Sequence, residues 1–72
     1  MIYELRDWYD DCRCLYTDDR RVKDLAVQSV DLSVTARYFR SPKAAEPFAW
    51  DIVGPRDTVN RIRQQFGGEE PK

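Results

Sequence analysis

The sequence predicts an α+β domain in which two helices cover one face of a four-stranded, mainly antiparallel sheet, in the order ββαββα. Three observations lead to this fold class. Apolar and polar residues alternate through residues 32–38, as in a strand with one buried face. Residues 17–30 and 54–66 carry apolar side chains at helical spacing. Two short stretches rich in β-forming residues precede the first of these helices.

The first two strands are predicted to form a hairpin. Residues 2–8, "IYELRDW", mix β-forming residues with charges at nearly alternating positions. Residues 12–16, "CRCLY", read as the second strand, and the intervening "YDD" is typical of a turn. The two strands are therefore expected to pair antiparallel.

A helix is expected after the hairpin. Thr17 is a suitable cap, and Asp18 and Asp19 lie where the helix dipole favours acids. The apolar residues that fall on one face of this helix are Val22, Leu25, Ala26 and Val30.

The third strand is the clearest in the sequence and lies within residues 31–40. Its two sides differ in composition: Leu32, Val34, Ala36 and Tyr38 are expected to face the helices, whereas Ser33, Thr35, Arg37 and Phe39 are expected to face away. Residues 41–47 contain two prolines and are predicted to be a loop.

The last strand, residues 48–53, is predicted to lead directly into a second helix. Gly54 and Pro55 suit the cap and the first helical position, and Gly67 is expected to end the helix. The inward side chains are expected to be Val59, Ile62 and Phe66.

The two halves of the chain share a pattern without sharing letters. When residues 15–25 are placed above residues 52–62 without a gap, Leu15 meets Ile52 and Val22 meets Val59. An ancient ββα duplication and the general likeness of strand–helix units both explain this pseudo-repeat. The layout resembles a permuted ferredoxin-like layer at the level of the fold, which does not name a function.

Length and composition set the broad class. The 72 residues form one domain, expected to be compact over residues 1–66 with a flexible tail over residues 67–72. Twelve basic against 13 acidic residues give a charge of −1, so the large basic excess of many nucleic-acid-binding or membrane-binding proteins is missing. No apolar run suggests a signal peptide or a membrane helix, so a cytoplasmic protein with reduced cysteines is expected.

Both cysteines lie on one strand, where Cys12 and Cys14 share a face. With no histidine in the chain, we expect no metal site, no cofactor and no activated thiol, and we expect both residues to fill space in the strand. Counting apolar residues puts Cys12, Cys14 and Tyr16 inside and Arg13 outside, whereas the pseudo-repeat puts Leu15 inside. We favour the first, because burying Arg13 without a partner would be costly.

A cation site is a weaker alternative use of the acidic residues near the hairpin. Oxygen ligands suffice for a hard cation. Their spacing matches no calcium loop, and aspartate is common in turns and at helix starts, so we treat them as structural. These residues are Asp10, Asp11, Asp18 and Asp19.

The side of the sheet expected to lie opposite the helices carries the candidate site. It combines aromatic and cationic side chains, which are enriched at protein interfaces. We therefore expect a non-enzymatic binding or interaction module that forms a homodimer through this face. The alternative is a single-stranded nucleic-acid binder that uses the same face. A small-molecule ligand is not identified. The residues expected on the binding face are Arg6, Trp8, Thr35, Arg37 and Phe39.

Overall fold

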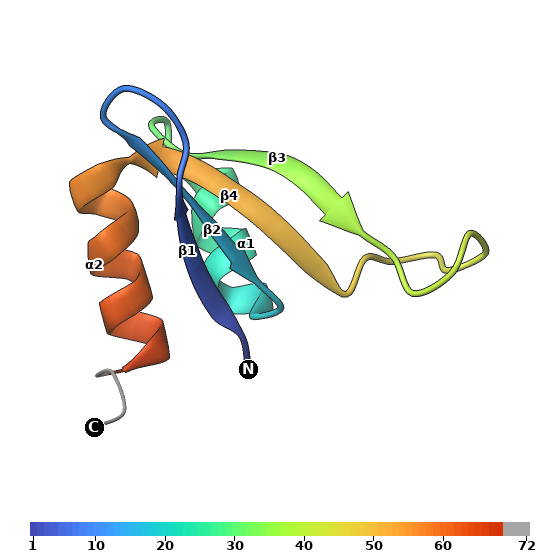
Figure 1. The fold of residues 1–72 in the computed structure, drawn as a ribbon. Helices are drawn as coiled ribbons and strands as arrows, with labels where there is room; N and C mark the ends of the chain where they lie inside the picture. The colour runs from blue at the N-terminus through green and yellow to red at the C-terminus, as the bar shows by residue number, and fades with distance from the viewer. Residues whose placement is uncertain (69–72) are drawn as a thin grey trace.

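A computed structural model describes residues 1–68 and shows the expected order of elements (Figure 1). The strands are β1 (Tyr3–Asp7), β2 (Cys12–Thr17), β3 (Ser33–Tyr38) and β4 (Ala49–Pro55), and the helices are α1 (Arg20–Gln28) and α2 (Arg56–Gly67). The predicted α+β fold class is confirmed. Most of the predicted tail, residues 69–72, lies outside the described residues.

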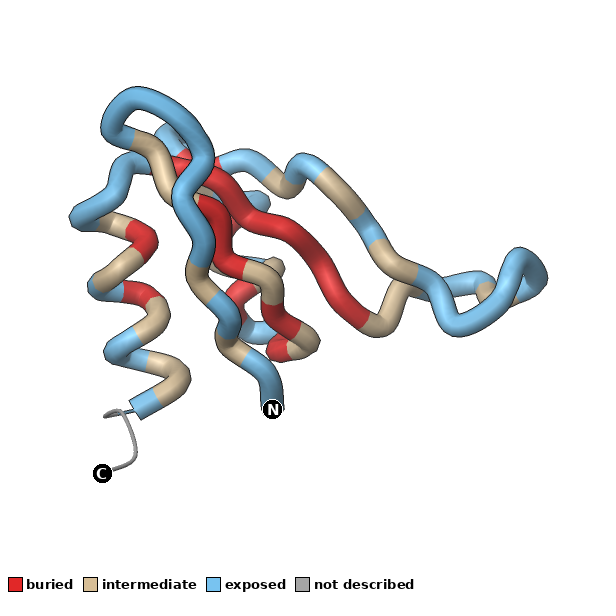
Figure 2. The backbone as a smooth tube through the Cα atoms, viewed as in Figure 1, coloured by how far each residue is buried: buried red, intermediate tan, exposed pale blue. Residues whose placement is uncertain are grey.

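The four strands form one sheet in the order β1-β2-β4-β3, and every neighbouring pair is antiparallel. Helix α1 connects β2 to β3, and β4 lies between these two strands in the sheet. The β2-α1-β3 segment is therefore a split βαβ unit. Strand β4 is buried from Ala49 to Gly54 and forms the long red segment in Figure 2. Strands β1 and β3 are the two edges of the sheet.

Both helices pack on the same face of the sheet, which we call the helix face; the opposite side is the open face. Helix α2 contacts β1, β2 and β4, and α1 contacts β3 and β4. Their buried side chains join one core with the strands. The buried members of this core are Leu15, Val22, Ala26, Leu32, Trp50, Ile52, Val59 and Ile62.

Helix α1 begins later than expected, because Thr17 is not its N-cap. The N-cap is Asp19, whose carboxylate accepts the Arg21 backbone N–H at 2.9 Å. Thr17 supports this cap, because its hydroxyl accepts the Asp19 N–H at 3.1 Å. The helix ends at Gln28, so Val30 lies beyond it and is fully exposed. The prediction that Val30 belongs to the buried face is wrong.

The junction between β4 and α2 explains the glycine at position 54. A Cβ atom built there would collide with the Leu32 side chain and lie 2.9 Å from the Asp31 carbonyl oxygen. Gly54 therefore allows β4 to pass close to the start of β3. Pro55 is the last residue of β4 and the N-cap of α2. The helix ends at Gly67, and Gly68 follows at a positive φ of 72°.

The orientation favoured for β2 is wrong. Leu15 pairs with Leu5 on one side and Ile52 on the other, and all three belong to the core side of the sheet. Cys12 and Cys14 therefore lie on the open face, as does Tyr16. Arg13 lies on the helix face, where Asn60 of α2 accepts a hydrogen bond from its Nη1 at 2.8 Å and Asp7 lies 3.5 Å from its Nε.

A bulge reverses the orientation of the second half of β3. The pairing with β4 shifts by one residue between Val34 and Ala36, so Val34 lies opposite Ile52 while Ala36 lies opposite Asp51. Ala36 and Tyr38 therefore face the open side, and Arg37, opposite Trp50, is on the helix face. The predicted sides are correct for the first half of the strand and wrong from Ala36 onward.

Candidate functional site

The residues expected to form one binding face lie on opposite edges of the sheet. Arg6 is in β1 and Trp8 follows it directly, whereas Thr35 and Arg37 are in β3 and Phe39 follows that strand. Strands β2 and β4 lie between the two groups. Arg6 also projects from the open face, whereas Arg37 belongs to the helix face. The structure therefore does not bring the five residues together as one surface.

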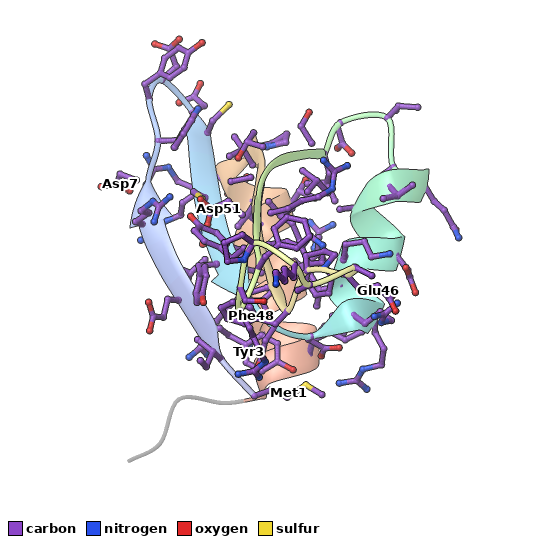
Figure 3. The ribbon with its side chains drawn as sticks, turned by 90° about the vertical axis from the view of Figure 1, so that its right-hand side faces the viewer. Met1, Tyr3, Asp7, Glu46, Phe48 and Asp51 are labelled. Carbon is purple, nitrogen blue, oxygen red and sulfur yellow. The ribbon has the colours of Figure 1, made fainter. Side chains whose placement is uncertain are left out.

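The centre of the open face holds a buried carboxylate instead. Asp51 of β4 is 3% exposed, and its Oδ2 accepts hydrogen bonds from Arg6 Nη2 at 2.8 Å and Tyr38 Oη at 2.7 Å. The ring of Tyr16 meets that of Tyr38 edge to face, with centroids 5.2 Å apart. Together with Cys14, these residues form a cross-strand cluster that draws on all four strands. Asp51 is labelled in Figure 3.

The chemistry of this cluster is that of a structural centre. Burial raises the pKa of the Cys14 thiol, and the Asp51 charge raises it further, although Arg6 lowers it. The thiol is therefore protonated at neutral pH and is a poor nucleophile. The hydrogen bond to Asp51 raises the pKa of Tyr38, which keeps the phenol protonated as a donor. Asp51 Oδ1 is buried without a hydrogen-bond partner, as is Arg13 Nε in β2.

A second buried carboxylate fastens the start of α1 to β1. Asp19 is 1% exposed and accepts hydrogen bonds from the Arg21 guanidinium, at 3.0 and 2.7 Å, and from the Tyr3 hydroxyl. Hydrogen bonds from Arg21 lower the pKa of Asp19 to about 2, against the opposing effect of burial. Every bond in this group joins parts of the chain to one another, so its role is structural.

The four aspartates considered as a cation site are not gathered. Asp10 and Asp11 precede β2, whereas Asp18 and Asp19 follow it. A six-residue strand separates the two pairs by about 20 Å. Asp10 occupies a turn at a positive φ of 53°, and Asp18 accepts the Ile2 N–H at 2.9 Å. The turn accounts for Asp10, and the hydrogen bond to Ile2 accounts for Asp18.

An open groove lies where β3 runs into the long β3–β4 loop. This groove, of about 550 Å³, is lined by residues 37–42 and Ala44. The segment extends away from the sheet (yellow-green in Figure 1). Backbone hydrogen bonds hold this segment, from the Phe48 N–H to the Tyr38 carbonyl at 2.8 Å and from the Ala44 N–H to the Ser41 carbonyl at 3.1 Å. Arg20 of α1 also pairs with Glu46 at 3.2 Å.

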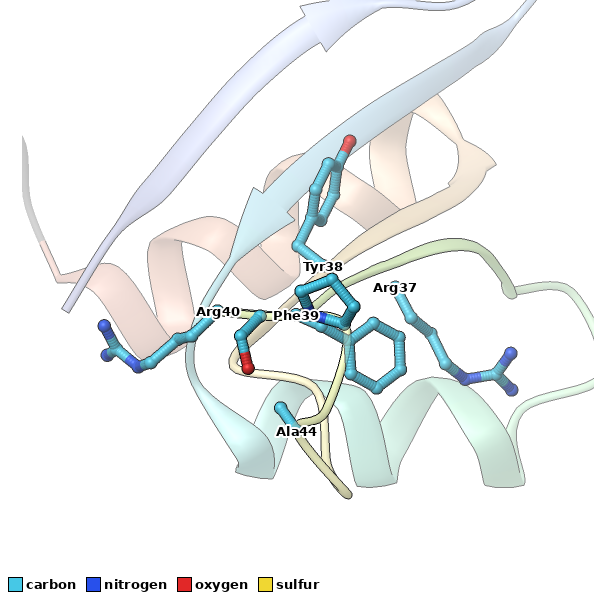
Figure 4. A pocket seen from close by; sticks show the side chains of 7 residues that line it. Arg37, Tyr38, Phe39, Arg40 and Ala44 are labelled. Atoms are coloured by element: carbon cyan, nitrogen blue, oxygen red, sulfur yellow. The ribbon is translucent and has the colours of Figure 1, made fainter.

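An exposed aromatic ring in this groove has an arginine side chain extending on either side of it. Phe39 is 46% exposed. Arg37 and Arg40 extend to opposite sides of it, while Tyr38 points toward the sheet (Figure 4). The Arg40 guanidinium stacks 4.9 Å from the centroid of the Phe48 ring, which limits its freedom. Arg37, Arg40 and Lys43 form no ion pair within residues 1–68.

Sequence reasoning identified Arg37 and Phe39 and missed two other features. Arg40 was not assigned to the site, although its place one residue after Phe39 in a cation-rich stretch was a usable signal. The cross-strand cluster was missed because Asp51 sits inside an apolar strand, and its partners come from β1 and β3. An aspartate in such a strand is itself a signal that a buried cation or donor lies nearby.

Three findings concern the described chain as a whole. Comparisons with known proteins find no matching family model, curated protein or solved structure. Within residues 1–68, no group of three or more histidine, cysteine, aspartate or glutamate side chains is placed to hold a metal ion. Neither described helix has the length and apolar character needed to cross a membrane.

Proposed function

We propose that the protein is a small binding module for single-stranded nucleic acid, and that the groove at the β3–β4 loop is its binding site. The observation that carries this proposal is the exposed Phe39 ring, with the Arg37 and Arg40 side chains extending on either side of it. An exposed aromatic face stacks on any base, and adjacent cations neutralise the phosphates on either side. An unstacked single strand offers both groups, whereas a duplex hides its base faces.

The size of the site sets the expected affinity. One base stack contributes about 1–3 kcal/mol, and two or three phosphate contacts add a salt-dependent share. We therefore expect a dissociation constant on the order of 10–100 μM at low salt. For single strands, two or three neutralised phosphates correspond to a slope of log K against log salt of roughly −1.4 to −2.1.

Fluorescence anisotropy with a labelled pentanucleotide tests the proposal, because so short a strand contacts one groove. Phe39→Ala should weaken binding by about 5-fold to 150-fold through loss of the stack. Arg37→Glu should weaken binding and make the salt slope shallower. The matched control is Trp8→Ala, which removes an aromatic ring of similar exposure, 43%, from the opposite edge and should leave binding unchanged.

Three outcomes would contradict the proposal. The first is no binding at 50 mM salt up to about 1 mM protein, a concentration well above the expected constant. The second is equal binding by the wild type and Phe39→Ala. The third is a free mononucleotide that binds as tightly as the pentanucleotide, which would assign the groove to a small ligand instead of a strand.

A further inference from the structure

The two edges of the sheet differ in how well they are protected against pairing with another strand. Strand β3 carries the bulge at Thr35, which interrupts a regular ladder. Strand β1 has five residues in an unbroken register with β2 and contains neither a bulge nor a proline. No strand formed by residues 1–68 pairs with its outer side. Strand β1 is therefore the edge that is better suited to pair with another strand.

Exposed apolar side chains gather at the two ends of this edge. Met1 and Ile2 precede β1 and are 80% and 41% exposed. Trp8 and Tyr9 follow it and are 43% and 68% exposed. These four make up the majority of the seven large apolar side chains that are exposed within residues 1–68. The charged residues Glu4 and Arg6 lie between these apolar ends.

We propose that two copies of the chain dimerise by pairing their β1 strands antiparallel about a two-fold axis at Leu5. The self-complementary order of this segment is the reason. In that register Glu4 lies opposite Arg6 of the second copy, whose guanidinium pairs with Asp51 through Nη2 but remains half exposed, and Ile2 lies opposite Trp8. Each of these two cross-strand pairs occurs twice in the dimer because of the two-fold symmetry. The result is a continuous eight-stranded sheet.

Neighbouring registers are disfavoured by charge. Paired residues must share a face of the sheet, so the register changes in steps that move the axis by one residue. An axis at Glu4 places the two Glu4 carboxylates opposite each other, and an axis at Arg6 does the same for the two guanidinium groups. Like charges directly opposite are destabilising. The axis at Leu5 is the register that replaces both clashes with opposite-charge pairs.

Light scattering of the wild type, a variant with a reversed charge in β1 and a control variant tests this dimer. The wild type should give a mass of about 17 kDa, twice the 8.5 kDa of one chain. Glu4→Arg sets like charges opposite each other twice and should raise the dimer dissociation constant at least about tenfold. Glu4 is exposed and forms no ion pair within residues 1–68, so the fold should persist. The matched control Asp24→Arg makes the same charge change on α1 and should leave the mass unchanged.

Amide hydrogen exchange locates the interface. Raising the protein concentration should slow exchange of the outward-facing β1 amides at least tenfold and leave the β3 edge unaffected. A monomer at all concentrations up to about 1 mM, an unchanged mass for Glu4→Arg, or protection of β3 in place of β1 would overturn the proposal. Pentanucleotide binding separates it from the proposed function, because Glu4→Arg should bind normally as a monomer and Phe39→Ala should remain a dimer.

Discussion

At the scale of single residues, two buried carboxylates connect the elements of the fold. Asp51 ties β4 to Arg6 on one edge and to Tyr38 on the other. Asp19 ties α1 to β1 through Arg21 and Tyr3. A buried carboxylate is tolerated only with such partners, so in each case the donors explain its position. Cys14 beside Asp51 is a buried, protonated thiol, whereas Cys12 is only half-buried.

Asp19 makes the stability of the protein depend on pH in the acid range. Its pKa is about 2 in the folded state against an ordinary 3.8, so the unfolded chain binds the proton more readily. The contribution, about 2 kcal/mol, is fully present above pH 4 and is lost as the pH falls toward 2. Asp19→Asn keeps a capping side chain but should lower the urea midpoint at pH 6, with little effect at pH 2.

The control for this pH dependence is Asp24→Asn, which removes an exposed carboxylate paired with Lys23. It should change stability by less than about 0.5 kcal/mol at pH 6 and at pH 2. A cost of Asp19→Asn that is the same at both pH values would show that the residue acts through capping alone.

At the scale of elements, sequence periodicity located all four strands and both helices, but it gave the wrong face for β2 and for the second half of β3. Arg13 could be placed inside only with knowledge that Asn60 of the distant α2 would meet it. The bulge at Thr35 has no local signal, because threonine is an ordinary strand residue. The orientation errors in β2 and β3 have these separate causes. The error in β2 moved Cys12 and Cys14 to the open face, and the error in β3 moved Arg37 to the helix face.

The close passage of β4 beside the start of β3 makes Gly54 sensitive to any side chain. Gly54→Ala forces a methyl group against Leu32 and the Asp31 carbonyl, so we expect a loss of about 1–3 kcal/mol in the free energy of unfolding. Gly68→Ala is the comparison: it meets nothing within 4 Å and costs only the strain of its positive φ, about 1 kcal/mol. Urea denaturation measures both. A Gly54→Ala protein within 0.5 kcal/mol of the wild type would show that Leu32 moves aside freely.

At the scale of the whole molecule, the sheet has two edges with different proposed roles. The radius of gyration of the molecule, 12.1 Å, exceeds the roughly 11 Å typical of a compact chain of this length, because the β3–β4 loop extends outward. The groove lies on the β3 side, and the self-complementary segment lies on β1. In the proposed dimer the two β3 edges would lie at opposite ends of eight strands, roughly 34 Å apart along the sheet. Such a dimer presents two separate sites to one longer strand, which raises avidity without a new contact.

Titration of the ¹⁵N-labelled protein with an unlabelled pentanucleotide, followed by amide chemical shifts, tests the proposed binding site most directly. The largest shift changes should fall on residues 37–44, saturate with a dissociation constant of about 10–100 μM and diminish as salt rises. Residues 3–7 of β1 should not move, because the dimer edge takes no part in binding. Shift changes centred on β1 and the adjoining hairpin, or none at millimolar strand, would contradict the assignment of nucleic-acid binding to the groove.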